Sequence, residues 1–442
     1  MKRLLPILFM IVLCACSVQI YDLQPIIVGT DTPRPSTPVI EATYYRSTDN
    51  PSSYDGTATP PIHIAPTEIL VSTNVNILEA SMIDGATGWA VGQIPGSVDN
   101  LILRTTDGGS NWKNVTPPQI LYDFGGYETE VASCFRDADY AWVLYRAGGA
   151  IDTVNGIKLW YTQDGGEKWE SANIPINGYT IQYFSGAKIG FVDHQTGWIF
   201  ARIGQSEGRE YIGIYTTHDG GASWTAMVTS DSENLASRSR KNGALFRDTL
   251  EGWISGENTV DEPGAVLWHT SDGGNSWYQQ TLPSPTGEDI PAGLLTDSGY
   301  SCSLSVPKYV DLQLNCAYAV LTCSGRDLDE PVSILYWTID NFYSWETYKL
   351  PKGTGNIAFY GLSYGWYSTA AEEGSDNPYV IYYTEDGGQT WREIAHPAWD
   401  SKLQFLNETV GFAVVTYNGQ NAFVKTVTAG YSWAQVFTMV GP

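Results

Sequence analysis

The sequence predicts an all-β fold in which seven similar four-stranded units close into a ring, and three observations support this. A segment of eight residues that ends in tryptophan recurs seven times along the 442-residue chain. The closing tryptophans are 57, 55, 53, 68, 46 and 42 residues apart, which suits four short strands and is too little for an independent domain. Aromatic residues make up 13% of the chain, charged residues only 16%, and no segment has a sustained helical period. We therefore predict a seven-bladed β-propeller of four-stranded antiparallel blades.

The eight-residue segment is a hairpin signal. Its first copy is Thr105–Trp112, and the later copies are Thr162–Trp169, Thr217–Trp224, Thr270–Trp277, Thr338–Trp345, Thr384–Trp391 and Thr426–Trp433. Asp-Gly between two apolar runs favours a tight turn, because glycine accepts positive φ and the carboxylate accepts hydrogen bonds from the turn amides. Two copies depart from the pattern. Asn341-Phe342 replaces Gly-Gly in the fifth copy, and Thr428 replaces the aspartate in the seventh. We expect structural roles for Asp107, Trp112, Asp164, Trp169, Asp219, Trp224, Asp272, Trp277, Asp340, Trp345, Asp386, Trp391 and Trp433.

A second motif precedes each hairpin, with an apolar residue, a polar residue two positions later, and then Gly or Ala before an aromatic. Its copies begin at Met82, Phe135, Phe191, Phe246, Phe359 and Phe405, and their small-aromatic pairs begin at Gly88, Ala141, Gly197, Gly252, Gly365 and Gly411. In the fifth copy, at Tyr309, either Cys316 or Tyr318 could hold the aromatic place. Apolar runs such as 212–215, 265–268 and 380–383 lie between the two motifs and suit a third strand. Each unit thus reads as strand, turn, strand, longer loop, strand, Asp-Gly-Gly turn and strand.

The hairpin pattern, Ser/Thr-x-Asp-x-Gly-x-x-Trp, resembles the Asp-box of the BNR repeat family, which occurs in sialidases, sortilin-type receptors and several propeller hydrolases. Seven boxes with a Gly-Trp strand ahead of each look most like the photosystem II stability and assembly factor family, on the sialidase-like superfold. The resemblance covers residues 66–442 and implies a seven-bladed propeller with its boxes on the rim of the blades. It does not fix an activity, because Asp-box propellers serve several unrelated functions.

The N-terminus has the features of an exported lipoprotein. Lys2 and Arg3 precede an apolar stretch, and residues 13–16 read Leu-Cys-Ala-Cys, which resembles the bacterial lipoprotein box. We predict a signal peptide over residues 1–15 and a lipid on Cys16, an ordinary signal peptide or an uncleaved anchor being the alternatives. Residues 16–65 are rich in Pro, Ser and Thr and predict a disordered tether. These features place the propeller outside the cytoplasm, anchored to a bacterial membrane or envelope.

The chain is strongly acidic. Its net charge is −24 (24 Lys and Arg against 48 Asp and Glu), and removing residues 1–15 would make it −26 (22 against 48). Such a charge repels nucleic acid and anionic membrane surfaces on average, so neither is an expected partner. The acidic charge is typical of a solvated surface that keeps an exported protein soluble. The alternative is that acidic loops bind a basic partner or cations.

The cysteines and histidines predict a disulfide and no metal. Cys302, Cys316 and Cys323 lie within 22 residues, and a disulfide among them is expected outside the cytoplasm. A pair that includes Cys302 is favoured, because residues seven apart on one strand point to opposite faces. The five histidines are scattered over different units and have no metal-ligand spacing, and no cofactor motif is present.

The sequence favours a binding protein over an enzyme. Of 16 tryptophans only Trp399 falls outside the repeats, so their number is explained by the framework. The Phe-Arg-Ile-Pro signature of sialidases is absent, and Arg136 and Arg247 occupy equivalent places in a repeat, which indicates a structural role such as pairing with a neighbouring acid. We predict a non-enzymatic, monomeric scaffold that binds a protein or glycan partner. Assembly of an envelope complex is one role that such a scaffold would serve. The alternative is a glycoside hydrolase, sialidase-like or polysaccharide-active, that uses two propeller carboxylates.

Overall fold

The computed structural model describes residues 75–441 except 96–99, 119–128, 148–156, 177–182, 207–208, 230–234, 236–238, 259–262, 288–289, 312 and 326. The chain divides into two units, Met1–Thr59 and Pro60–Pro442, and every described strand belongs to the second. The signal peptide, Cys16 and the tether lie outside the described residues. Within the described ranges, no helix has the length and hydropathy needed to cross a membrane.

Antiparallel pairing in sequence order groups the strands into sets of four. The first three sets are β1 (Asn76–Met82), β2 (Gly88–Gln93), β3 (Asn100–Thr105) and β4 (Asn111–Asn114); β5 (Thr129–Phe135), β6 (Ala141–Ala147), β7 (Ile157–Thr162) and β8 (Glu170–Ile174); and β9 (Ser185–Phe191), β10 (Gly197–Ser206), β11 (Arg209–Thr217) and β12 (Thr225–Val228). The fourth set is β13 (Arg240–Phe246), β14 (Gly252–Glu257), β15 (Ala265–Thr270) and β16 (Tyr278–Gln280).

The remaining strands form three further sets and two additional strands. The sets are β18 (Lys308–Asp311), β19 (Cys316–Gly325), β20 (Val332–Thr338) and β21 (Glu346–Lys349); β22 (Gly355–Tyr360), β23 (Tyr364–Ala370), β24 (Tyr379–Thr384) and β25 (Arg392–Ala395); and β26 (Asp400–Phe405), β27 (Gly411–Tyr417), β28 (Gln420–Thr426) and β29 (Ala434–Val436). The additional strands are β17 (Tyr300–Leu304) and β30 (Met439–Gly441). We call the seven sets units one to seven.

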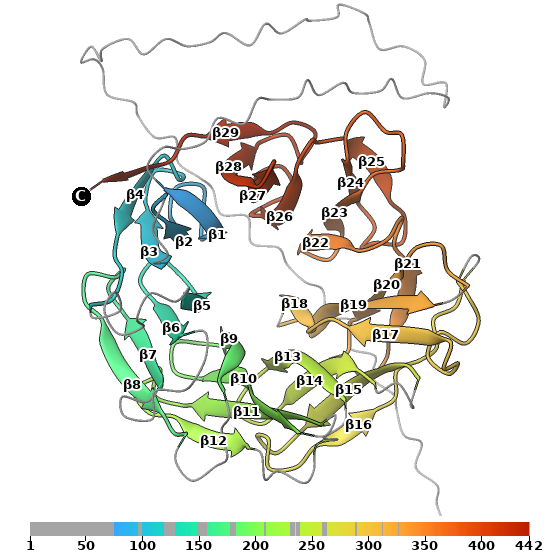
Figure 1. The fold of residues 1–442 in the computed structure, drawn as a ribbon, viewed down its shortest axis with the longest axis horizontal. Coiled ribbons are helices and arrows are strands. Elements are labelled where there is room, and N and C mark those ends of the chain that lie inside the picture. Colours follow the sequence, from blue (N-terminus) through green and yellow to red (C-terminus); the bar gives the residue numbers. More distant parts are fainter. Residues whose placement is uncertain are drawn as a thin grey trace, which may run out of the picture. The chain divides into compact units, whose positions relative to one another are not determined.

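The units follow one another around a common axis, and the first strand of each lies nearest that axis (Figure 1). The predicted all-β propeller is confirmed. The longer loop predicted between the second and third strands is short in unit three, since β10 continues to Ser206 and β11 begins at Arg209.

The end of the chain closes the ring onto its beginning. β30 pairs parallel with β4, with Met439 opposite Asn111. On the inner side, the Gln404 amide donates to the main-chain carbonyl of Met82 at 2.8 Å and accepts from the Met82 N–H at 2.8 Å. Phe412 and Phe423 of unit seven share a buried cluster with Trp112 of unit one. The contact between units one and seven therefore combines strand pairing, side-chain hydrogen bonds and apolar packing.

The aromatic of the second motif joins each unit to the next. Its indole N–H donates across the interface from Trp89 to the Asp137 carbonyl at 2.8 Å, from Trp142 to Gly220 at 2.7 Å, from Trp198 to Ala244 at 3.1 Å and from Trp366 to Ala429 at 2.8 Å. These four indoles are at most 7% exposed. A buried indole gives both apolar contact and a satisfied donor, so these residues fix the distance between neighbouring sheets.

Unit five departs from the repeat. Ala317 pairs with Thr338 and Tyr318 with Trp337, as Gly88 pairs with Thr105 and Trp89 with Arg104 in unit one, so Tyr318 holds the aromatic place. The additional strand β17 pairs with the far half of β19 and bridges to β14 of unit four through Ser303 and Glu257. The inserted strand explains why the interval of 68 residues is the longest.

Candidate functional site

The Asp-box carboxylates are held by their own turns. In unit one, Thr105 Oγ1 donates to Asp107 Oδ1 at 3.0 Å, the Asn111 N–H donates to the same oxygen at 2.8 Å, and Thr105 Oγ1 accepts the Gly109 N–H at 3.0 Å. The same three contacts recur at Asp164, Asp219, Asp272, Asp340 and Asp386. Each carboxylate thus serves as the anchor of a hairpin.

The two imperfect boxes keep the same geometry by other means. In unit seven, the Thr428 hydroxyl takes the place of the carboxylate and accepts the Ser432 N–H at 3.0 Å. In unit five, Asn341 and Phe342 adopt the positive φ of 59° and 70° that Gly-Gly supplies in the boxes of units one to four and six. Phe342 is 1% exposed and packs on Trp253 with ring centroids 4.2 Å apart. Buried aromatic packing offsets the unfavourable backbone conformation of a bulky residue there.

The box tryptophans also have structural contacts. The indoles of Trp224, Trp277, Trp391 and Trp433 donate to the main chain of their own turns, and that of Trp169 donates to Val115 of unit one. Trp112 and Trp345 pack against Phe423 and Phe342. Trp399, outside the repeats, packs edge-on against Trp433.

The polar residue of the second motif is held in the same way. Asp84 Oδ1 accepts the N–H groups of Ala86 and Thr87, at 2.7 and 2.6 Å. Equivalent pairs of contacts occur at Asp137, Asp193, Asp248, Asp311 and Asn407. The acids that the two motifs supply are therefore turn residues.

These hydrogen bonds predict loss of stability in acid. Partial burial alone would raise the pKa of Asp107, Asp219, Asp340 and Asp386, but hydrogen bonds from the box outweigh it and hold each pKa below the usual 3.8. A carboxyl whose pKa is lower in the folded than in the unfolded chain stabilises the fold above the unfolded value, and this contribution is lost as pH falls through the folded value. We expect the urea midpoint to be level from about pH 7 to about pH 5 and to fall steeply below about pH 4.

The measurement is equilibrium urea unfolding at constant ionic strength across that range. An Asp386→Asn variant should show a shallower decline, because one of the titrating carboxyls is gone. A midpoint that stays level to pH 3 would contradict this assignment of the box carboxylates.

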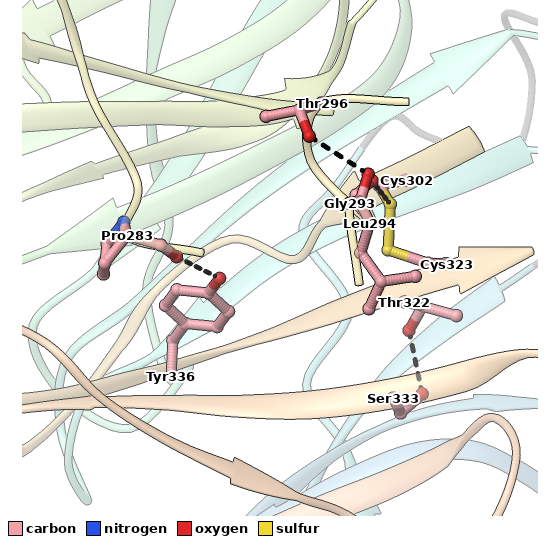
Figure 2. Close-up of a disulfide and its surroundings, with 9 residues drawn as sticks. All are labelled: Pro283, Gly293, Leu294, Thr296, Cys302, Thr322, Cys323, Ser333 and Tyr336. Carbon is pink, nitrogen blue, oxygen red and sulfur yellow. Dashed lines mark hydrogen bonds between the residues drawn. A yellow bond between two sulfur atoms is a disulfide. The ribbon is translucent and has the colours of Figure 1, made fainter. Parts of the chain in front are cut away.

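Figure 2 shows a disulfide between Cys302 of β17 and Cys323 of β19, which are directly paired in the register of the two strands. It lies beside the buried Leu294, whose carbonyl is 3.1 Å from Cys302 Sγ. Cys316 is a free, buried cysteine near the start of β19, and Cys134 is also free. The disulfide fastens the inserted strand to unit five.

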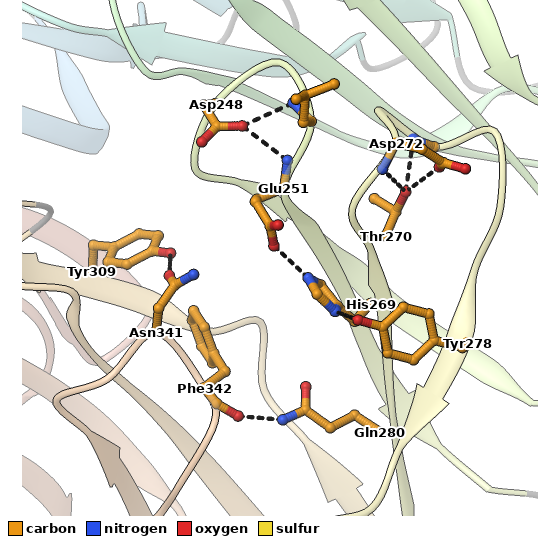
Figure 3. A network of polar contacts seen from close by, with 12 residues as sticks. Asp248, Glu251, His269, Thr270, Asp272, Tyr278, Gln280, Tyr309, Asn341 and Phe342 are labelled. Carbon is orange, nitrogen blue, oxygen red and sulfur yellow. Dashed lines mark hydrogen bonds and ion pairs between the residues drawn. The ribbon is translucent and has the colours of Figure 1, made fainter. Parts of the chain in front are cut away.

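Figure 3 shows a polar network on the outer strands of unit four. His269 Nε2 is 2.5 Å from a Glu251 oxygen, and His269 Nδ1 contacts the Tyr278 hydroxyl. His269 is 6% exposed and stacks on Trp253, whereas Tyr278 is 51% exposed. A neutral histidine satisfies both contacts by donating from Nε2 and accepting from the phenol. A carboxylate, an imidazole and an exposed hydroxyl in series form a possible proton-transfer chain.

The register shows that this network occupies a repeat position. His269 pairs with Trp253 and Tyr278 as Tyr161 pairs with Trp142 and Glu170 in unit two. There, the Tyr161 hydroxyl donates to Glu170 at 2.7 Å. In unit six the equivalent pair places Arg392 over the Tyr383 ring. Because side chains of different chemistry make this cross-strand contact in three units, it is a framework contact.

The axis-facing strands of units three to five carry an excess of basic residues. β9 holds Lys188, β13 holds Arg240 and Lys241, and β18 holds Lys308 with a single acid, Asp311, at its end. Arg202 of β10 joins them, since its Nη2 donates to the Lys241 carbonyl at 2.9 Å. We call Lys188, Arg202, Lys241 and Lys308 the basic sector.

The Glu210 carboxylate contacts two members of the basic sector. Glu210 accepts from Arg202 Nε at 2.9 Å and from the Lys241 N–H at 2.8 Å. Lys241 is 1% exposed, its Nζ donates to the Ser239 carbonyl at 2.8 Å, and burial lowers its pKa to about 8 although Glu210 opposes the shift. Sequence reasoning missed this cluster, because its members come from three units and no motif contains them.

The other predicted positions are dispersed. Arg136 has a structural contact with the next unit, where its Nη1 donates to the Phe191 carbonyl at 2.8 Å and its charge helps to lower the pKa of Asp193. His194 lies 2.6 Å from Asp137, and His396 lies 3.3 Å from Glu393. Among the described residues, no group of three or more His, Cys, Asp or Glu side chains is placed to hold a metal ion.

Comparison with known proteins supports the fold. No family model matches the chain. No curated protein matches it either. Similar solved structures include YCF48 bound to a D1 peptide, with 18% identity, a TM-score of 0.49, and coverage of 84% of this chain and 99% of that one. A PL25 ulvan lyase bound to -[GlcA(1-4)Rha3S]- has 12% identity, a TM-score of 0.50, and coverage of 81% and 96%.

A GH74 xyloglucanase from Xanthomonas campestris is also similar, with 12% identity and a TM-score of 0.49 over 82% of this chain and 53% of that chain. At these identities the likeness concerns the fold and leaves the activity open.

Proposed function

We propose that this chain is a non-catalytic binding propeller that works outside the cytoplasm, held at a bacterial membrane by a lipid on Cys16. The observation that carries the proposal is the use of the repeated acids. Asp107 and its five counterparts, like Asp84 and its counterparts, accept hydrogen bonds from their own turns. A carboxylate with these contacts and a lowered pKa is a poor general acid, because it holds no proton near neutral pH. The repeats thus supply a rigid frame, and recognition falls to surfaces mounted on it.

The partner is a protein or a glycan, and its capture tests the proposal. Full-length lipidated protein is crosslinked in envelope membranes, purified, and assayed beside a glycan array and a panel of fluorogenic glycosides. The proposal expects a stable partner or a bound glycan and no turnover. Saturable hydrolysis that disappears when one acid is replaced would contradict it.

The lipid anchor needs its own test, since a propeller can bind a partner without a membrane. We expect the wild-type chain to enter the detergent phase on phase separation, and a Cys16→Ser variant to be released into the aqueous phase. Equal partitioning of the two would remove the anchor from the proposal and leave the binding role standing.

The second candidate is a glycoside hydrolase, and the network in Figure 3 is the observation in its favour. An exposed phenol that contacts a histidine, itself bound to a carboxylate, can exchange a proton with a ligand. If turnover is found, a Tyr278→Phe variant should abolish it, whereas a matched Tyr343→Phe variant on the neighbouring box should not. The recurrence of the same contact in units two and six favours the framework role.

A further inference from the structure

The basic sector is a local exception to the charge of the molecule. The chain has 48 acidic and 24 basic residues, yet Lys188 and Lys308 lie on axis-facing strands close enough for the charges of Lys308 and Arg202 to lower the pKa of Lys188. Neither Lys188 nor Lys308 forms an ion pair within the described part of the chain, and the acid on β18, Asp311, accepts the N–H groups of its own turn. Two positive charges of the sector, those of Lys188 and Lys308, therefore have no counter-charge among the described residues.

Contacts with the main chain hold the sector in place. Lys188 Nζ donates to the Asn242 carbonyl at 2.7 Å, which carries its ammonium from unit three to unit four. The Asn242 amide donates in turn to Ser303 Oγ and to the Leu304 carbonyl of unit five, each at 2.8 Å. The Lys188 side chain packs against Gly243. A Cβ added to Gly243 would lie 3.1 Å from Lys188 Cδ and 2.7 Å from Val306 Cγ2. The ammonium is thus positioned between three units.

Electrostatic repulsion between the positive charges of the basic sector is unfavourable in the absence of a bound anion. Surrounding protein lowers the pKa of Lys188, and the charges of Arg202 and Lys308 lower it further. Burial also lowers the pKa of Lys308, although its side chain reaches solvent, as expected inside a ring. Like charges held together in a partly desolvated place destabilise one another. An anion placed between the ammonium groups would remove that repulsion and gain charge-assisted hydrogen bonds.

We propose that the basic sector is a binding site for the carboxylate of a small acidic ligand, with Lys188 and Lys308 as its two donors. This rests on the proposed binding function and names the chemistry that it recognises. The charge of Arg202 also acts on Lys188, and Glu210 fixes the Arg202 side chain. Two ammonium groups suit a carboxylate, which accepts at both oxygens.

The rest of the surface argues for a small ligand. Charges closer than about 8 Å act on one another at physiological salt, whereas more distant ones are screened. A single carboxylate bound at the basic sector would therefore interact mainly with Lys188 and Lys308. A long polyanion would have to extend from it over a surface on which acids outnumber bases two to one.

The test is a calorimetric titration of the full chain in detergent with glucuronate and with malonate. Glucose serves as the neutral control for the sugar ring. Binding of both acids and not of glucose would support a carboxylate site, and binding of glucuronate alone would support it with an acidic sugar as the ligand. No heat with either acid at millimolar concentration would overturn the proposal.

Variants separate this site from a general effect of charge. Lys188→Gln and Lys308→Gln should each weaken binding about tenfold, whereas Lys168→Gln, on an exposed box turn, should not change it. Lys308→Gln should also leave the ligand-free chain at least as heat-stable as the wild type, because it removes a repelling charge, while reducing the rise in Tm that glucuronate causes. A structural lysine would instead lower the Tm of the ligand-free chain, and that result would overturn the assignment.

The outcome also separates this proposal from the proposed function. If both lysine variants still capture the envelope partner with wild-type yield and still bind glucuronate, the basic sector is not the site and the binding role stands. If the wild type hydrolyses glycosides, the non-catalytic role is wrong whatever the lysines do.

Discussion

Replacing Trp366 with alanine is expected to lower the free energy of unfolding by about 3–5 kcal/mol, the largest effect of any single change considered. Trp366 is fully buried between units six and seven, where its ring stacks on Phe405 with centroids 3.4 Å apart. Its indole N–H donates to the Ala429 carbonyl at 2.8 Å. Alanine would leave a cavity and an unsatisfied carbonyl at an interface that the whole ring needs.

Urea unfolding followed by tryptophan fluorescence and by circular dichroism measures this change. A Trp366→Phe variant keeps a ring and loses the donor, so it should be intermediate, about 1–2 kcal/mol below the wild type. Tyr343→Ala, at a side chain that is 79% exposed, is the matched control and should lie within about 0.5 kcal/mol of it. If Trp366→Ala unfolds at the wild-type midpoint, the interface between units six and seven is not as described.

Removing the disulfide is expected to cost about 3 kcal/mol, the second largest effect. Cys302 and Cys323 are separated by 21 residues, and closing a loop of that length restricts the unfolded chain. A Cys302→Ala/Cys323→Ala variant should therefore unfold at lower urea, with unit five affected first because β17 has its longest pairing with β19.

Reductant provides the matched comparison. Dithiothreitol should lower the midpoint of the wild type and leave that of the double variant unchanged. A Cys316→Ala variant, at the free cysteine, should retain the sensitivity to reductant. A wild type that is indifferent to reductant would show that this pair adds no stability.

The repeated parts of the fold could be predicted because they are local. A turn such as Thr105–Trp112 is stabilised by contacts within eight residues, so its sequence alone specifies it. The same holds for the acid of the second motif, which binds N–H groups two and three positions away. Seven copies then indicate a ring, since each unit exposes two faces that only its neighbours can cover.

The pairing of the cysteines could not be fixed from the sequence. Three candidates lay close together, and alternation along a strand favoured a pair with Cys302. The choice between partners depends on the register of β17 against β19, and β17 is an insertion that no other unit repeats. Long-range register of this kind has no local signal.

The basic sector was not predictable for a related reason. Lys188, Lys241 and Lys308 are separated by more than fifty residues each, and they meet only because the ring brings first strands together at its axis. The network around His269 could have been found by aligning the units, because Glu251 and Tyr278 flank Gly252 and Trp277 of the two motifs.

Ring closure is the claim on which the interfaces and the basic sector depend, and one crosslink tests it most directly. β30 at the end of the chain pairs with β4 near its beginning, with Met439 opposite Asn111. In a background with Cys134→Ser and Cys316→Ser, the pair Asn111→Cys/Met439→Cys should form an intramolecular disulfide on mild oxidation, identified by peptide mapping of the monomer. The pair Lys113→Cys/Met439→Cys, two residues out of register, should form little. Equal yields from both pairs, or a crosslink found only between molecules, would contradict a closed ring.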